Sequence, residues 1–167
     1  MSTRLLSDDA LLAQCRWDQF RGSGPGGQKR NKTSNAVRLT HTPTGVSATA
    51  TESRSLSENK LYALRRLKLK LASDLRESAT FEPPEWFLTI RHDNRIAASH
   101  RHPLFAAAGG LILDLLQALG GNPAAVAINL GVSTTAVIKL LETEPHLWAA
   151  ANHIRAAAGL EPLAHRR

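Results

Sequence analysis

A cluster of glycines interrupts the chain near its start, at residues 22–28, whose sequence is GSGPGGQ. Glycine is the residue that adopts positive φ or lets a backbone approach another molecule closely, and ordering several glycines together costs conformational entropy. The cluster therefore predicts a loop that the fold keeps for a purpose. The cations that flank it are Arg21, Lys29, Arg30 and Lys32. We expect this bare backbone to approach a polyanion.

Positive charge is concentrated in the first half of the chain, which has 167 residues and suffices for one domain or two small ones. Residues 1–80 hold 14 Lys and Arg against 7 Asp and Glu, whereas residues 81–167 hold 7 of each. This imbalance predicts that the first half meets an anion, most simply nucleic acid. A solvated, soluble surface is the alternative interpretation of the same count.

The single cysteine, Cys15, excludes a disulfide framework and any zinc site built from several cysteines. We expect it to fill the core, and we expect no metal or cofactor. The sequence has no apolar run long enough for a membrane span and no signal-peptide pattern at its start, where Asp8 and Asp9 lie. We therefore expect a cytosolic protein with no membrane partner.

The first half predicts an α+β fold in which a small mixed β-sheet packs on a long helix. Ser7 is placed to cap a short helix, residues 15–21 and 37–40 read as strands, and residues 42–45 form a turn into a strand at 46–51. Residues 55–58 fit a capping box for a helix that runs to about residue 77. The predicted apolar stripe of that helix is Leu61, Leu64, Leu67, Leu71 and Leu75.

The second half predicts an all-helical module. Residues 81–102 read as a connector because Pro83 and Pro84 exclude a continuous helix. Helices are expected at 104–119 and 124–130, then after a cap at Ser133 and after a cap at Thr143. We thus expect a catalytic domain at 1–80, a connector at 81–102 and a helical module at 103–167. Residues 123–138 resemble a helix-turn-helix, whose few candidate base readers are Thr134, Thr135 and Lys139.

Two phosphate-binding motifs fail to explain the glycine cluster. Residues 22–27 satisfy the dinucleotide pattern GxGxxG, but no apolar strand precedes them and no apolar helix follows them. A P-loop needs a lysine where this chain has Gln28. The cluster therefore needs a third explanation.

The ordered string around the cluster resembles the GGQ loop of class I peptide chain release factors. Residues 21–28 read RGSGPGGQ, and they are followed by NKT at 31–33, AVRLTH at 36–41, PTG at 43–45, RS at 54–55 and Asn59. The resemblance covers about residues 12–75. It is strongest to the short proteins that hold the catalytic domain alone, as ribosome-rescue hydrolases do.

The resemblance implies hydrolysis of the peptidyl-tRNA ester on the ribosome, with Gly26, Gly27 and Gln28 as catalytic residues. The main-chain N–H of Gln28 would stabilise the developing oxyanion, and the glycines would give the backbone the dihedrals that aim it. The implied partners are 23S-type rRNA at the peptidyl-transferase centre, the P-site peptidyl-tRNA and a glutamine methyltransferase acting on Gln28, with the protein a monomer. We expect RNA contacts from Arg21, Ser23, Lys29, Arg30, Lys32, Arg54 and Lys60.

The chain also departs from the family pattern. Lys29 and Arg30 replace the His-Val that often follows the glutamine, and the codon-recognition portion has no counterpart. The chain ends in His165-Arg166-Arg167 rather than in the long basic tail of rescue hydrolases. Lys29 and Arg30 add charge where RNA is expected, the missing codon-recognition portion favours codon-independent release, and the missing tail argues against sensing of the mRNA channel. Two alternatives remain open at this point: a non-catalytic ribosome- or RNA-binding factor, and a helix-turn-helix DNA-binding regulator.

Overall fold

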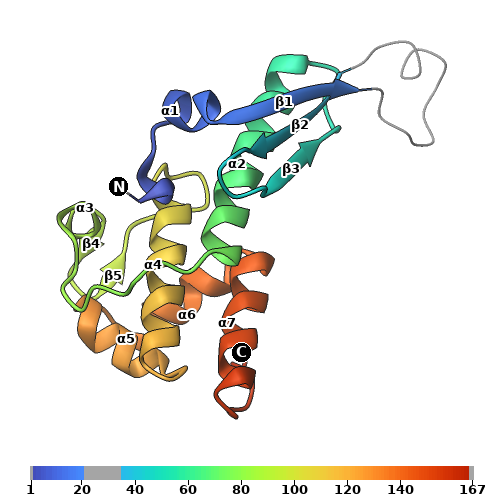
Figure 1. Cartoon of the computed structure of the whole chain (residues 1–167). Coiled ribbons are helices and arrows are strands. Elements are labelled where there is room, and N and C mark those ends of the chain that lie inside the picture. The colour runs from blue at the N-terminus through green and yellow to red at the C-terminus, as the bar shows by residue number, and fades with distance from the viewer. Residues whose placement is uncertain (1, 21–34, 166–167) are drawn as a thin grey trace. The chain divides into compact units, whose positions relative to one another are not determined.

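The computed structural model describes residues 2–20 and 35–165, and tertiary contacts divide the chain into two compact units, residues 1–71 and residues 72–167 (Figure 1). Both units combine helices with a small antiparallel sheet, which confirms the α+β class. The division into segments 1–80, 81–102 and 103–167 stays a prediction.

A three-stranded sheet with β2 at its centre forms the framework of the first unit. The elements in order are η1 (Thr3–Leu5), α1 (Asp8–Ala13), β1 (Cys15–Phe20), β2 (Ala36–His41), β3 (Ser47–Ala50) and α2 (Leu56–Asp74). Both strand pairings are antiparallel, so the expected mixed sheet is wrong in that detail. The reason is that consecutive strands lie side by side, and a tight turn forces β3 to return along β2.

The predicted turn at 42–45 is confirmed. Gly45 has φ +72° and its N–H donates to the carbonyl of His41 at 2.8 Å, while the His41 N–H donates to the carbonyl of Val46 at 2.8 Å. The left-handed φ is strained for a side chain with a Cβ, so glycine suits this position. The turn thereby fixes the register of β2 against β3.

The core of the first unit lies between the sheet and α2, which runs along one face of the sheet (Figure 1). The buried apolar residues of this layer are Val37, Leu39, Ala48, Ala50, Ala63, Leu64, Leu67 and Leu71. Leu61 was expected in the stripe but is 40% exposed. It lies about 120° around the helix from Leu67, outside the sheet-facing arc that Ala63 occupies instead.

Two cations of α2 bind the edge strand β3. Arg66 Nη1 donates to the carbonyl of Thr49 at 2.7 Å, and Lys70 Nζ donates to the carbonyl of Ser47 at 3.0 Å. Alternate carbonyls of a strand point the same way, so residues spaced four apart on α2 reach both. These bonds occupy edge carbonyls that would otherwise be available for pairing with another chain.

The predicted capping box of α2 forms only in half. Ser55 Oγ accepts from the Glu58 N–H at 3.4 Å, as an N-cap does. The reciprocal bond is absent from the described contacts, because the Ser55 N–H donates to Ser53 Oγ at 2.9 Å and that hydroxyl in turn donates to the Glu58 carboxylate. Ser53 therefore stands between the two members of the box.

A helical layer around α4 forms the second unit. Its elements are α3 (Glu85–Leu88), β4 (Arg91–His92), β5 (Arg95–Ile96), α4 (Phe105–Ala118), α5 (Pro123–Leu130), α6 (Thr134–Glu142) and α7 (Pro145–Ala157). Every residue of α4 from Phe105 to Leu116 is buried, and α5, α6 and α7 all contact it. Among the described helices none is by itself long and apolar enough to cross a membrane, although α5 and α6, bent by 110°, pass together on length and composition.

Helices α4 and α7 approach closely at Gly109. A Cβ placed there would lie 2.5 Å from Cδ1 of Leu147, a side chain that is fully buried. Such a contact is well inside van der Waals distance, so the absence of a side chain at Gly109 lets the helices meet.

The structure corrects one prediction in this unit and adds detail to another. The connector at 81–102 contains helix α3 and the hairpin β4–β5, whose turn is made by Asp93 with φ +50°. Aspartate tolerates this left-handed conformation better than most residues, so the Asp93-Asn94 pair was an available turn signal. Thr143 does not cap α7; it ends α6, and its hydroxyl donates to the Lys139 carbonyl at 2.8 Å, while Glu144 is the N-cap.

Helices α5 and α6 form the predicted helix-turn-helix. They are inclined by 110° and joined at Gly131, whose φ is +65°. The hairpin braces this turn, because the Ser133 N–H donates to the Asn94 carbonyl at 2.8 Å and Arg91 Nη1 donates to the Leu130 carbonyl at 3.4 Å. Hairpin and helix-turn-helix are thus connected by one main-chain hydrogen bond and by one hydrogen bond from the Arg91 side chain.

Candidate functional site

The expected catalytic residues Gly26, Gly27 and Gln28 lie outside the described residues. The same is true of five of the expected RNA-binding residues: Arg21, Ser23, Lys29, Arg30 and Lys32. The described site therefore consists of the two points where segment 21–34 joins the fold, together with Arg54 and Lys60. We call this region the loop base: residues 17–20, 35–38 and 53–60.

The ladder between β1 and β2 brings the two ends of segment 21–34 together. Phe20, the last residue of β1, pairs with Ala36, the first residue of β2, and Gln19 pairs with Val37. Directly opposed Cα atoms of an antiparallel pair lie about 5 Å apart. The segment that carries the glycine cluster thus begins and ends at one cross-strand pair.

Asn59 holds the second end of the segment. It is fully buried on α2, and its Nδ2 donates to the carbonyl of Asn35 at 2.6 Å and to the carbonyl of Ser53 at 2.8 Å, while its Oδ1 accepts from the Ser53 N–H at 2.9 Å. All the hydrogen-bonding capacity that a buried amide needs is met by main-chain groups. One side chain therefore ties residue 35 to the segment that leads into α2.

A second bond reinforces the same junction. Asn35 Nδ2 donates to the carbonyl of Arg54 at 2.7 Å. Asn35 is therefore bonded both to the Asn59 side chain and to the main chain of the segment that leads into α2. The Arg54 side chain is exposed, and it remains available for a polyanion. The main-chain carbonyl of Arg54 thus supports the fold, whereas its guanidinium makes no ion pair with the described residues.

Cations and aromatic rings alternate around the loop base. Lys60 Nζ lies 5.5 Å from the ring centroid of Trp17, and Arg38 Cζ lies 5.3 Å from that of Phe20. Each is within the range of a cation–π contact, which at exposed sites contributes about 0.5–1 kcal/mol. Trp17 is 48% exposed, so its ring is open to an incoming partner. The base combines charge with π surface, a combination that suits nucleic acid.

His41 is a structural residue at the far end of the same hairpin. Its ring is buried; Nε2 lies 3.0 Å from Gln14 Oε1 and Nδ1 lies 2.8 Å from Thr44 Oγ1. Because the amide oxygen can only accept, Nε2 carries the proton and Nδ1 accepts from the Thr44 hydroxyl. Burial lowers the pKa of His41, so the neutral form is favoured. The structure thus places His41 within the fold rather than facing a partner.

No side-chain nucleophile stands out in the described part of the first unit. Burial raises the pKa of the Cys15 thiol, which keeps it protonated and weakly nucleophilic. No group of His, Cys, Asp and Glu able to hold a metal ion occurs among residues 2–20 and 35–165.

Sequence reasoning missed two features of the loop base. Asn59 enters the sequence argument only as a member of the family string, although an asparagine one turn inside a helix with an apolar stripe is a signal for a buried amide with main-chain partners. Arg38 is only one residue of the predicted strand at 37–40, and its cation–π contact with Phe20 depends on the register of β1 against β2. That register is not visible in the sequence.

Comparison with known proteins identifies the family of this chain. Residues 11–98 match the family model described as the RF-1 domain, and this is more than half of the chain. The chain therefore belongs to the RF-1 domain family. The match extends beyond the string at 12–75 to include α3 and the hairpin β4–β5.

Curated relatives share the same region. The chain is 49% identical over 67 residues to peptide chain release factor 1 of Frankia casuarinae, covering 40% of this chain and 19% of the relative. It is 46% identical over 76 residues to peptide chain release factor 2 of Corynebacterium glutamicum, covering 46% of this chain and 21% of the relative. The chain thus spans about a fifth of the length of these relatives.

Proposed function

We propose that this protein hydrolyses the ester between nascent peptide and tRNA on the ribosome, without reading a codon. The observation that carries the proposal is the loop base: the segment holding Gly26, Gly27 and Gln28 begins and ends at the pair Phe20–Ala36. Membership of the RF-1 domain family and the relatives' names as peptide chain release factors support it.

The chemistry fits a site without a side-chain nucleophile. A water oxygen forms a bond to the ester carbonyl carbon, the bond from that carbon to the ribose oxygen of the tRNA breaks, and a proton passes to the ribose oxygen. Negative charge develops on the carbonyl oxygen during the attack. A main-chain N–H aimed at that oxygen stabilises it, and we assign this donor to Gln28. Removing one such donor costs about 10²–10³ in rate in other enzymes.

Positive charge would position the segment among RNA phosphates. Arg21, Lys29, Arg30 and Lys32 flank the proposed catalytic residues, and Arg54 and Lys60 extend the charge onto the loop base. Phosphate contacts fix position and orientation with little sequence readout. Ser23 adds a hydroxyl donor of the kind that also contacts phosphate. Methylation of Gln28 by a glutamine methyltransferase is part of the same proposal.

The test is peptide release from ribosomes that carry labelled peptidyl-tRNA in the P site. Three complexes are compared, in which the A site is empty, filled with a sense codon or filled with a stop codon. We expect release from at least one complex, with no preference for stop over sense codons. Release confined to stop codons would overturn codon independence. Absence of release from all three, with ribosome binding intact, would favour a non-catalytic binding factor.

A further inference from the structure

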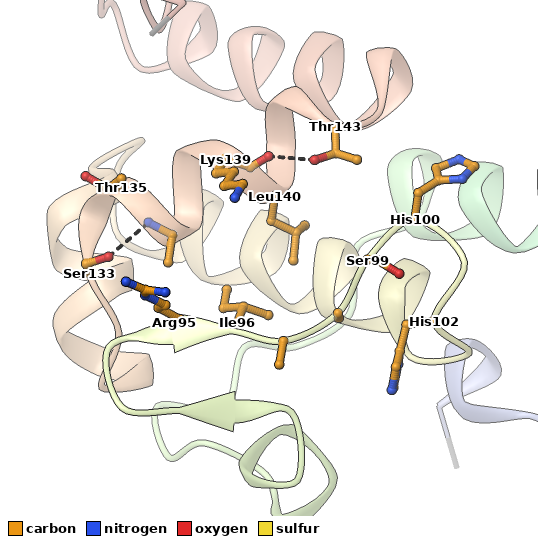
Figure 2. A pocket seen from close by; sticks show the side chains of 13 residues that line it. Arg95, Ile96, Ser99, His100, His102, Ser133, Thr135, Lys139, Leu140 and Thr143 are labelled. Atoms are coloured by element: carbon orange, nitrogen blue, oxygen red, sulfur yellow. Dashed lines mark hydrogen bonds between the residues drawn. The ribbon is translucent and has the colours of Figure 1, made fainter.

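A groove of about 820 Å³ lies in the second unit between β5 with its following segment and α6 (Figure 2). Its floor is apolar and includes Ile96, Ala136 and Leu140. The polar residues that line it are Arg95, Ser99, His100, His102, Ser133, Thr135, Lys139 and Thr143. No aspartate or glutamate is among the residues that line it. The groove therefore combines cations and hydroxyls over an apolar base.

The two permanent cations stand on opposite walls. Arg95 comes from β5 and Lys139 from α6, as Figure 2 shows. Neither has a carboxylate partner among the described residues, whereas Arg76 of the same unit is paired with Asp114 at 3.3 Å. Residues 81–167 carry no net charge as a whole. The excess of positive charge in the groove is therefore a local feature of this surface. Uncompensated cations on facing walls are suited to an anion between them.

The other polar groups that line the groove carry no negative charge, and three of them already have partners within the fold. His100 is held by the Glu144 carboxylate at 3.3 Å, and the Thr143 hydroxyl donates to the Lys139 carbonyl. Ser133 already caps α6 by accepting from the Ala136 N–H at 3.1 Å. The attraction of the groove for an anion therefore rests on its side chains and does not depend on an uncapped helix end.

We propose that this groove binds the sugar–phosphate backbone of single-stranded RNA. Arg95 and Lys139 would neutralise phosphates, Thr135 would meet ribose hydroxyls, and the apolar floor would accommodate the sugar. The choice of RNA over other polyanions rests on the proposed function, which places the protein on the ribosome. Duplex DNA is disfavoured because the exposed face of α6, with Thr134, Thr135 and Lys139, lacks the Arg, Asn or Gln that read base edges.

A site-specific crosslink tests the proposal in the full-length protein. A photoreactive amino acid replaces Thr135 inside the groove or, as the matched control, Ile128 on α5, which is 82% exposed and outside the groove. Each protein is irradiated with a single-stranded 12-nucleotide RNA, with a DNA duplex, and with ribosomes. We expect RNA crosslinks from position 135 and none from position 128. Crosslinks from 135 to a ribosomal protein or preferentially to the DNA duplex would overturn the proposal.

Salt dependence of RNA binding provides a second measurement. The double variant Arg95→Ala/Lys139→Ala should show a shallower dependence of the RNA association constant on salt. The negative slope of log K against log[salt] should shrink in magnitude by about 1.4, because each lost phosphate contact on a single strand contributes about 0.7. Arg101→Ala removes an exposed cation that does not line the groove and should leave the slope within error of wild type. Equal slopes in the double variant and wild type would overturn the proposal.

The outcomes separate the groove from the proposed function. Crosslinking from position 135 together with failed peptide release would leave the groove standing and refute the hydrolase. Peptide release without any RNA crosslink from position 135 would refute the groove and leave the hydrolase standing.

Discussion

The side-chain amide of Asn59 donates a hydrogen bond of 2.6 Å to the main-chain carbonyl of Asn35, the first residue that the structure describes after the glycine-bearing segment. Helix α2 therefore holds one end of that segment, and the pairing of Phe20 with Ala36 holds the two ends together. Under the proposed function this segment presents one N–H to the reacting ester, and fixed ends would help it to do so, because misplacement of a catalytic group by about 1 Å can cost about 100-fold in rate.

Replacing Asn59 by alanine should weaken both fold and release. It removes hydrogen bonds to Asn35 and Ser53 and leaves their main-chain groups unpaired in a buried place, at a cost of about 3 kcal/mol. We expect the release rate to fall at temperatures where the variant is still folded. Leu67→Ala is the control, because it destabilises the same core by about 2–5 kcal/mol without touching the loop base. Equal release rates in the two variants would remove the positioning role of Asn59.

Acidification should destabilise the first unit through His41. Burial lowers the pKa of the folded imidazole below its usual value of 6.5, so the unfolded chain binds the proton more readily. The contribution of His41 is therefore fully present above about pH 6.5 and is lost as pH falls through the lower, folded pKa. Urea unfolding at pH 7.5 and pH 5 should show a larger loss of stability in wild type than in His41→Gln. A loss of the same size in both proteins would contradict this account.

Adding a methyl group at Gly109 should disrupt the contact between α4 and α7. The new Cβ would lie 2.5 Å from Leu147 Cδ1, and overpacking of this kind costs about 1–3 kcal/mol. Leu147→Ala opens space for that methyl, so the double variant should be more stable than the sum of the single effects predicts, by about 1 kcal/mol. Leu130→Ala, combined with Gly109→Ala, is the additive control. Additivity in both cycles would show that the two helices do not meet at this point.

Lys60 should contribute to ribosome affinity more than to the rate of chemistry. Its ammonium lies on the ring of Trp17 at the loop base and has no ion pair among the contacts described. A phosphate contact made by charge alone acts on binding, so Lys60→Gln should raise the half-saturating ribosome concentration about three- to tenfold at low salt. The maximal release rate should not change. Lys68→Gln is the control, since Lys68 is already paired with Asp8; a reduced maximal rate in Lys60→Gln alone would assign it a different role.

Local patterns predicted much of the fold. The pattern at residues 37–40 predicted β2, the turn signal at 42–45 predicted its turn, and the cap at Ser133 predicted the start of α6. These succeeded because each depends on hydrogen bonds and dihedrals within a few residues. The family string likewise identified the loop, because its order is specific.

Features that depend on distant contacts were not visible in the sequence. The exposure of Leu61, the capture of Arg66 and Lys70 by β3, and the pairing of Arg38 with Phe20 follow from how α2 and β1 meet the rest of the sheet. The hairpin β4–β5 was missed because its strands have two residues each, too few for a periodic pattern. The groove beside it depends on that hairpin and was missed with it.

The central claim is that the backbone at Gly27 and Gln28 performs the release reaction. The most direct measurement is single-turnover release of labelled peptide at saturating protein, for wild type and Gly27→Ala, with ribosome binding measured in parallel. We predict a fall of about 100-fold or more in the release rate with unchanged binding, because the added side chain misdirects the N–H that stabilises the oxyanion. Release by Gly27→Ala at the wild-type rate would contradict the account.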